Sequence, residues 1–115
     1  MNDQELSALA AEFGQAWNDH DLERALELVT DDCVFESTGP APDGERATGR
    51  DAVRAAWKPI FDDARSHFDT EDMILAGDRI VSTWRYTWGD GSIRGVDVMR
   101  ARDGRIAEKF SYVKG

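Results

Sequence analysis

The sequence predicts an α+β fold in which three N-terminal helices pack in the concave face of a curved, mostly antiparallel sheet, giving a cone-shaped roll. Two observations predict it. Apolar residues recur every three or four positions up to about residue 61, and they alternate with a period of two from residue 66 onward. Helices followed by an antiparallel meander give an α+β order rather than an alternating βαβ one. At 115 residues, we expect residues 1–115 to form a single domain.

The helical period occurs in three segments. Residues 3–18 gather their apolar side chains on one face, namely Leu6, Leu9, Ala10, Phe13, Ala16 and Trp17. Asp21 is the expected N-cap of a second, short helix. The run Thr48-Gly49-Arg50-Asp51 matches a capping-box signal and predicts the start of a third helix. Pro59 lies inside that helix without an N–H to donate, so we expect a kink or a weakened turn there.

Strand signals follow. Cys33 to Ser37 reads as a short strand and Thr38 to Ala47, with its prolines and glycines, as a loop. Glycine-containing turns then separate four longer runs, which predict strands near 67–76, 79–88, 92–102 and 105–113. Because helices cover only one face of an antiparallel sheet, the wide end of the cone can remain open as a cavity.

Composition argues against several classes of partner and cofactor. Lys and Arg number 14 against 23 Asp and Glu, so the net charge is −9, which argues against nucleic acid or an anionic membrane as a partner. We see no signal peptide and no apolar run of membrane-spanning length, so the cytoplasm is the expected location. Cys33, the single cysteine, is interpreted as a buried structural thiol. With two distant histidines and no phosphate or dinucleotide motif, we expect no metal and no cofactor.

Three stretches carry a family resemblance: residues 13–34, with Trp17-Asn18-Asp19-His20-Asp21-Leu22 inside it, residues 48–53 and residues 95–106. They resemble SnoaL-like proteins of the nuclear-transport-factor-2-like superfamily, over nearly the whole chain. The resemblance implies a cystatin-like roll, one pocket for a small hydrophobic ligand and a homodimer. It also implies an activity range that includes polyketide cyclases, ketosteroid isomerases, limonene-epoxide hydrolases and scytalone dehydratase.

The residues that those enzymes use are only partly present. Against ketosteroid isomerases, the oxyanion-hole aspartate matches Asp97, whereas Phe13 stands for the tyrosine and Ser37 for the general base. Against the epoxide hydrolases, the arginine matches Arg85, but its two aspartates are replaced by Thr87 and Ser111. The resemblance therefore argues against both complete machineries, and it leaves Asp97 as the candidate acid/base.

Asp97 interrupts an apolar strand, where aspartate is disfavoured, so we expect either a pocket carboxylate that relays protons or a structural pairing with Lys or Arg. Lys109 is the candidate partner. Its orientation is open because hydrophobicity sends Ile106, Glu108, Phe110 and Tyr112 inward, whereas the resemblance sends Ala107, Lys109, Ser111 and Val113 inward.

The strand 79–88 carries an aromatic set, Trp84, Tyr86 and Trp88, that we expect to face the helices, with the Tyr86 hydroxyl as a donor to a ligand. His67 is a candidate at the pocket rim because histidine side chains can exchange a proton near neutral pH, and a surface position is the alternative. The expected ligand contacts, which ordinary core packing would explain equally well, are Phe13, Trp17, Phe35, Ser37, Trp57, Phe61, Trp84, Met99 and Ser111.

Three functions follow from these residues. The first is a cofactor-free isomerase, cyclase or lyase acting on a hydrophobic carbonyl or cyclic metabolite, with Asp97 as acid/base assisted by Tyr86, Lys109 or His67. The second is a non-catalytic module that binds an apolar ligand. The third is a dimerisation domain with a filled cone. Val96 and Val98, alternating with Asp97 and Met99, predict a homodimer through the outer face of the sheet.

Overall fold

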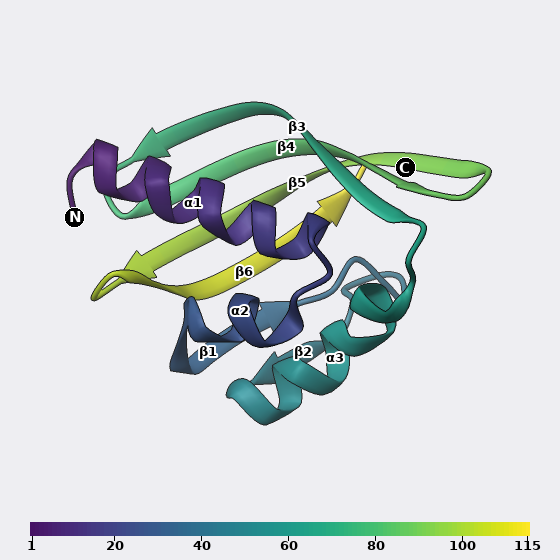
Figure 1. Ribbon diagram of the computed structural model, residues 1–115, viewed down its shortest axis with the longest axis horizontal. Helices are drawn as coiled ribbons and strands as arrows, with labels where there is room; N and C mark the ends of the chain where they lie inside the picture. The colour runs from purple at the N-terminus through teal and green to yellow at the C-terminus, as the bar shows by residue number, and fades with distance from the viewer.

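The computed structural model describes residues 1–115 as three helices packed against one six-stranded, mixed sheet that does not close (Figure 1). The predicted α+β class is confirmed. The elements, in chain order, are α1 (Asp3–Asn18), α2 (Leu22–Glu27), β1 (Val29–Glu36), β2 (Arg46–Thr48), α3 (Arg50–Asp62), β3 (Ser66–Ala76), β4 (Arg79–Trp88), β5 (Gly91–Arg102) and β6 (Arg105–Val113).

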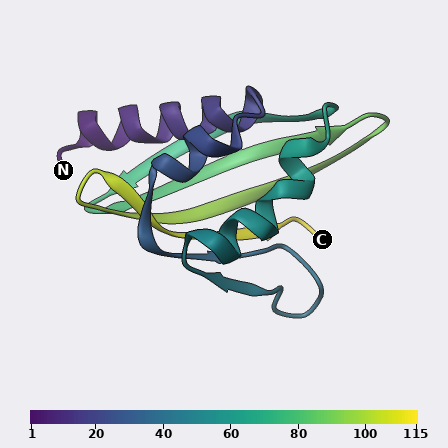
Figure 2. The same cartoon turned by 60° about the horizontal axis from the view of Figure 1, so that its bottom comes forward.

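The sheet has the strand order β2-β1-β6-β5-β4-β3, and every neighbouring pair is antiparallel except β1 with β6. Figure 1 shows the three helices in front of the strands, and Figure 2 shows them following one another along that same side. The opposite face of the sheet carries no helix. None of the three helices combines the length and the apolar character needed to span a bilayer.

Capping residues set the helix ends. Asn2 and Glu5 form a capping box at the start of α1, and the Asp21 carboxylate accepts the Arg24 N–H at the start of α2, as predicted. The capping box predicted at Thr48 is wrong. The N-cap of α3 is Gly49, which makes no side-chain cap and has φ of 88°, a conformation that favours glycine because it has no Cβ. The helix continues through Pro59 to Asp62.

The first strand begins four residues earlier than Cys33. Its start pairs in parallel with β6, Val29 opposite Ile106, and the pairing resumes at Val34 opposite Glu108 after an irregularity. The expected loop after β1 ends in the short strand β2, whose Ala47 lies opposite Phe35. The early start of β1 leaves no local pattern in the sequence because its partner, β6, is distant along the chain.

The orientation of β6 is decided by a β-bulge. Ala101 lies opposite Ile106, but Arg100 lies opposite Glu108, so Ala107 is an extra residue between the two pairs. Ile106 therefore points into the core before the bulge, and Lys109 and Ser111 point inward after it. The inward set predicted from hydrophobicity is therefore correct at Ile106, before the bulge. The inward set predicted from the family resemblance is correct at Lys109 and Ser111, after it.

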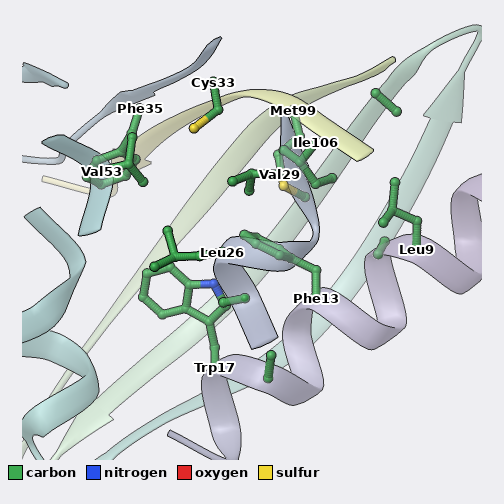
Figure 3. Close-up of a cluster of buried hydrophobic side chains, with 14 of the residues drawn as sticks. Leu9, Phe13, Trp17, Leu26, Val29, Cys33, Phe35, Val53, Met99 and Ile106 are labelled. Carbon is green, nitrogen blue, oxygen red and sulfur yellow. The ribbon is translucent and has the colours of Figure 1, made fainter. Parts of the chain in front are cut away.

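The narrow end of the roll is filled by a cluster of 18 buried residues drawn from all three helices and the inner face of the sheet. Figure 3 shows Phe13 of α1 directed toward Val29 and Met99, and Trp17 of α1 beside Leu26 of α2. Cys33 is 3% exposed in this cluster, and burial raises the pKa of its thiol. Trp17 and Phe35 of this cluster also line the open cavity beside it, so the core forms part of the cavity wall.

Candidate functional site

An open cavity of about 780 Å³ lies at the wide end of the roll, between α3, the β1–β2 pair and the strands β3 to β6. This volume falls in the range that holds a small organic ligand. Of the 20 residues that line it, 13 are hydrophobic. Its aromatic wall consists of Trp17, Phe35, Phe68, Trp84, Tyr86 and Trp88. The cavity therefore offers mainly apolar contact, with few polar groups.

The register of β4 with β5 positions this wall. Trp84 lies opposite Gly95, and Trp88 lies opposite Gly91. A Cβ on Gly95 would come within 2.5 Å of the Trp84 ring, and one on Gly91 within 2.6 Å of the Trp88 ring. Each indole therefore lies over a glycine backbone, and both glycines are needed because any side chain there would displace the ring.

The aromatic rings also stack along the wall. The Phe68 and Tyr86 ring centroids lie 4.6 Å apart with an interplanar angle of 21°, and those of Tyr86 and Trp88 lie 5.3 Å apart at 29°. The facing side is formed by α3, which presents Ala52, Ala55, Ala56 and Ile60. Stacked rings on one side and small side chains on the other make a slot that suits a flat ligand.

A connected polar group lies at the inner end of the cavity. The Lys109 Nζ donates a hydrogen bond to Ser111 Oγ at 2.9 Å, and Ser111 Oγ donates to Asp97 Oδ1 at 2.7 Å. The Lys109 Nζ also lies 3.4 Å from Asp97 Oδ2, and the two side chains are only 11% and 14% exposed. Opposite charges this well buried are strongly coupled because little water screens them.

Aromatic faces surround the same ammonium group. The Lys109 Nζ lies 4.9 Å from the Trp17 ring centroid and 5.1 Å from that of Phe35. Both contacts are within the range of a cation–π interaction. Lys109 and Ser111 line the large cavity, whereas Asp97 lines a neighbouring space of about 60 Å³. Lys109 lines both spaces, so Lys109 and Ser111 stand between the carboxylate and the large cavity.

Tyr86 supplies a second polar group. Burial raises the pKa of its phenol above the ordinary value of 10.0, and the charge of Asp63 raises it further. The phenol is therefore neutral at physiological pH, and its hydroxyl is available as a donor in the cavity. Asp63 also lines the cavity, and hydrogen bonds from Arg65 lower the pKa of its carboxyl.

Most of the predicted site residues meet at these two spaces, but a few do not. Phe13 and Met99 line the smaller space with Asp97, and Trp57 and Phe61 are buried in the core outside the large cavity. His67 lies on the other face of the sheet, with its side chain 52% exposed and Nε2 3.0 Å from Asp69 Oδ1. The remaining predicted contacts, all on the wall of the large cavity, are Trp17, Phe35, Ser37, Trp84 and Ser111.

Sequence reasoning missed the α3 side of the cavity. Ala52, Ala56 and Ile60 follow the apolar period of the third helix, but that period alone does not distinguish a cavity wall from core packing. Trp88, by contrast, follows from the alternation of β4 and was identifiable as a wall residue. No group of three or more His, Cys, Asp or Glu side chains is positioned to share a metal ion.

Comparison with known proteins identifies relatives of the whole chain. Residues 10–109 match the SnoaL-like domain family. An NTF2-like protein of unknown function from Mesorhizobium loti is 41% identical, with a TM-score of 0.89 over 100% of this chain and 97% of that one. A candidate ketosteroid isomerase from Kribbella flavida is 18% identical, with a TM-score of 0.83 over 97% of this chain and 79% of that one.

A computationally designed 17-OHP binder is also similar, at 26% identity and a TM-score of 0.81 over 96% of this chain and 91% of that one. No curated protein matches the sequence. The comparisons thus agree on the fold and differ in the activities of the proteins that share it.

Proposed function

Because the chain belongs to the SnoaL-like family, we propose that it binds a hydrophobic carbonyl-bearing or cyclic metabolite in the large cavity and converts it by cofactor-free general acid/base catalysis, as an isomerase, cyclase or lyase. The observation that carries this proposal is the Lys109–Ser111–Asp97 group at the inner end of an apolar cavity. Apolar walls with a few convergent polar groups are typical of small-molecule sites.

Each polar group has a role in this chemistry. The Lys109 ammonium donates to the carbonyl oxygen of the ligand and stabilises the negative charge that develops there on enolisation. Ser111 relays the abstracted proton to Asp97, which holds it until the product is protonated. The neutral Tyr86 phenol offers a further hydrogen-bond donor to a ligand oxygen in the cavity.

The relatives support the ligand class. The designed relative binds 17-OHP, so this fold can enclose such a ligand. The aromatic slot of this chain presents stacked Phe68, Tyr86 and Trp88 rings, an arrangement that suits a flat ligand. The volume of about 780 Å³ also argues against a cone that is filled by its own side chains and serves only for dimerisation.

Binding is tested with 2-acetylnaphthalene, a flat aryl ketone, by quenching of the fluorescence of the cavity tryptophans. We expect saturable quenching in the wild type. The variant Ala56→Trp should abolish it, because the larger side chain enters the slot from α3. The matched control Ala11→Trp, at an exposed position of α1, should bind as the wild type does. Equal quenching in both variants would place the ketone elsewhere and contradict the proposal.

Catalysis is tested on the same ketone by NMR, as exchange of its methyl protons with deuterium from the solvent. The variant Asp97→Asn should slow exchange while leaving the affinity for the ketone unchanged, since Asp97 lies outside the large cavity. A wild type that binds but does not exchange would favour the second candidate, a binding module. That alternative is favoured by one observation: both Asp97 oxygens already have partners in the protein.

We propose a homodimer as the assembled form. Four apolar residues lie in register across the uncovered face of the sheet, one on each of the strands β3 to β6, namely Ile74, Val81, Val98 and Phe110. Ile74 is 54% exposed. Pairing two copies through this row would remove its apolar surface from water.

A further inference from the structure

We infer that Lys109 is a nucleophile that captures an aldehyde or ketone in the large cavity as a Schiff base. This inference rests on the proposed function, because it needs a carbonyl ligand in that cavity. The lysines of the chain are Lys58, Lys109 and Lys114. Lys58 is 62% exposed and Lys114 is exposed near the C-terminus, whereas Lys109 is 11% exposed and lines the cavity. A lysine removed from water inside an apolar pocket is the setting in which amines act as nucleophiles.

The amine must lose a proton before it can attack a carbonyl carbon, and the structure supplies a route. The Lys109 Nζ donates to Ser111 Oγ at 2.9 Å, and Ser111 Oγ donates to Asp97 Oδ1 at 2.7 Å. Both hydrogen bonds point from the amine to the carboxylate. A shift of one proton along each of them leaves a neutral amine in the cavity, an intact serine hydroxyl and a protonated Asp97.

Formation of the Schiff base then needs only the carbonyl compound, Lys109 and the proton held by Asp97. The neutral Nζ forms a bond to the carbonyl carbon, and its proton passes to the carbonyl oxygen to give a carbinolamine. Asp97 returns its proton through Ser111 to the carbinolamine hydroxyl, which leaves as water. The products are a protonated Schiff base on Lys109, one water molecule and the Asp97 carboxylate. No oxidant or reductant takes part.

The surroundings of Lys109 suit the product. The Schiff-base cation takes the place of the ammonium, 3.4 Å from Asp97 Oδ2 and close to the Trp17 and Phe35 rings, with centroids at 4.9 and 5.1 Å from Nζ. A lysine that served only to neutralise Asp97 would gain nothing from lining the cavity. Here the amine and the serine are the two members of the group that face it, and Asp97 lies behind them.

The test is reductive trapping. The purified protein is incubated with 6-methoxy-2-naphthaldehyde and sodium cyanoborohydride, and the modified peptides are quantified by mass spectrometry. We expect Lys109 to be modified at least about tenfold faster than Lys58 and Lys114, which serve as internal controls in the same sample. The variant Lys109→Arg should lose the fast labelling, and Lys58→Arg should retain it. Equal labelling of all three lysines, or none at Lys109, overturns the inference.

The role of the relay is tested with a matched pair. Ser111→Thr keeps the hydroxyl and should keep most of the trapping rate, whereas Ser111→Ala breaks the route to Asp97 and should slow trapping. The affinity of each variant for the unreactive analogue 2-naphthalenemethanol is measured in parallel, and trapping rates are compared at saturating aldehyde. A slower rate at saturation then identifies Ser111 as a positioning residue, separately from any change in binding. Equal rates in the two variants contradict the relay.

The same analogue separates this inference from the proposed function. Binding of 2-naphthalenemethanol that Ala56→Trp abolishes, together with no preference for Lys109 in trapping, rejects the Schiff base and leaves the ligand-binding cavity in place. Absence of both binding and trapping rejects the proposed function as well.

Discussion

The Lys109 Nζ lies 3.4 Å from Asp97 Oδ2 on the neighbouring strand, and both side chains are nearly buried. Ser111, directly opposite Asp97 in the β5–β6 register, bridges the two with its hydroxyl. This ion pair lies between the packed core and the open cavity, so it has consequences for stability as well as for chemistry.

Removing one member of the pair should cost more than removing both charges. Lys109→Met leaves the Asp97 carboxylate buried without its cation, and we expect a loss of about 3 kcal/mol in the free energy of unfolding. Adding Asp97→Asn to Lys109→Met should recover part of that loss, because no uncompensated charge remains. Urea denaturation of the four members of the double-mutant cycle measures this. Strictly additive losses would mean that the two side chains are not coupled.

The Tyr86 phenol should titrate above its ordinary value of 10.0, because burial raises its pKa. The unfolded chain then loses the phenol proton first as the pH rises. The contribution of Tyr86 to stability is therefore complete below about pH 10 and is lost as the pH rises through the folded pKa. Tyr112→Phe leaves Tyr86 as the single tyrosine, so absorbance at 295 nm follows it alone. A midpoint at or below 10.0 in the folded variant would contradict this expectation.

Substitution of Gly95 should disturb the aromatic wall. A Cβ there would lie 2.4 Å from the Tyr112 carbonyl oxygen and 2.5 Å from the Trp84 ring, so Gly95→Ala should destabilise the fold by about 1–3 kcal/mol. Gly14→Ala is the control, since no atom lies within 4 Å of its Cβ and it sits in α1. That change should stabilise by about 0.5–1 kcal/mol. Thermal unfolding should therefore give a lower melting temperature than the wild type for Gly95→Ala and a higher one for Gly14→Ala.

A charge in the apolar row of the outer face should prevent dimerisation. Val98→Asp places a carboxylate between Val81 and Phe110, where a dimer would bury it without a partner. Light scattering should give twice the chain mass of 12.9 kDa for the wild type and the single mass for Val98→Asp. Ala11→Asp, at an exposed position of α1 on the other side of the sheet, should remain dimeric. A monomeric wild type would refute the proposed assembly.

The sequence by itself determined the helices, the hairpins and the fold class. The expected strands 79–88 and 105–113 coincide with β4 and β6, because glycine turns and side-chain alternation are local properties of the chain. The aromatic alternation on β4 likewise identified Trp84, Tyr86 and Trp88 as one set, and the resemblance singled out Asp97.

Only the tertiary structure decided which groups share the cavity. The parallel pairing of β1 with β6 places Phe35 opposite Lys109, and the bulge at Ala107 turns Lys109 and Ser111 inward. Both features depend on the register between strands that are distant in sequence, and a one-residue shift in that register reverses the face of every side chain beyond it. Alternation within a strand gives two sets of side chains, and the pairing with the neighbouring strands determines which set faces the cavity.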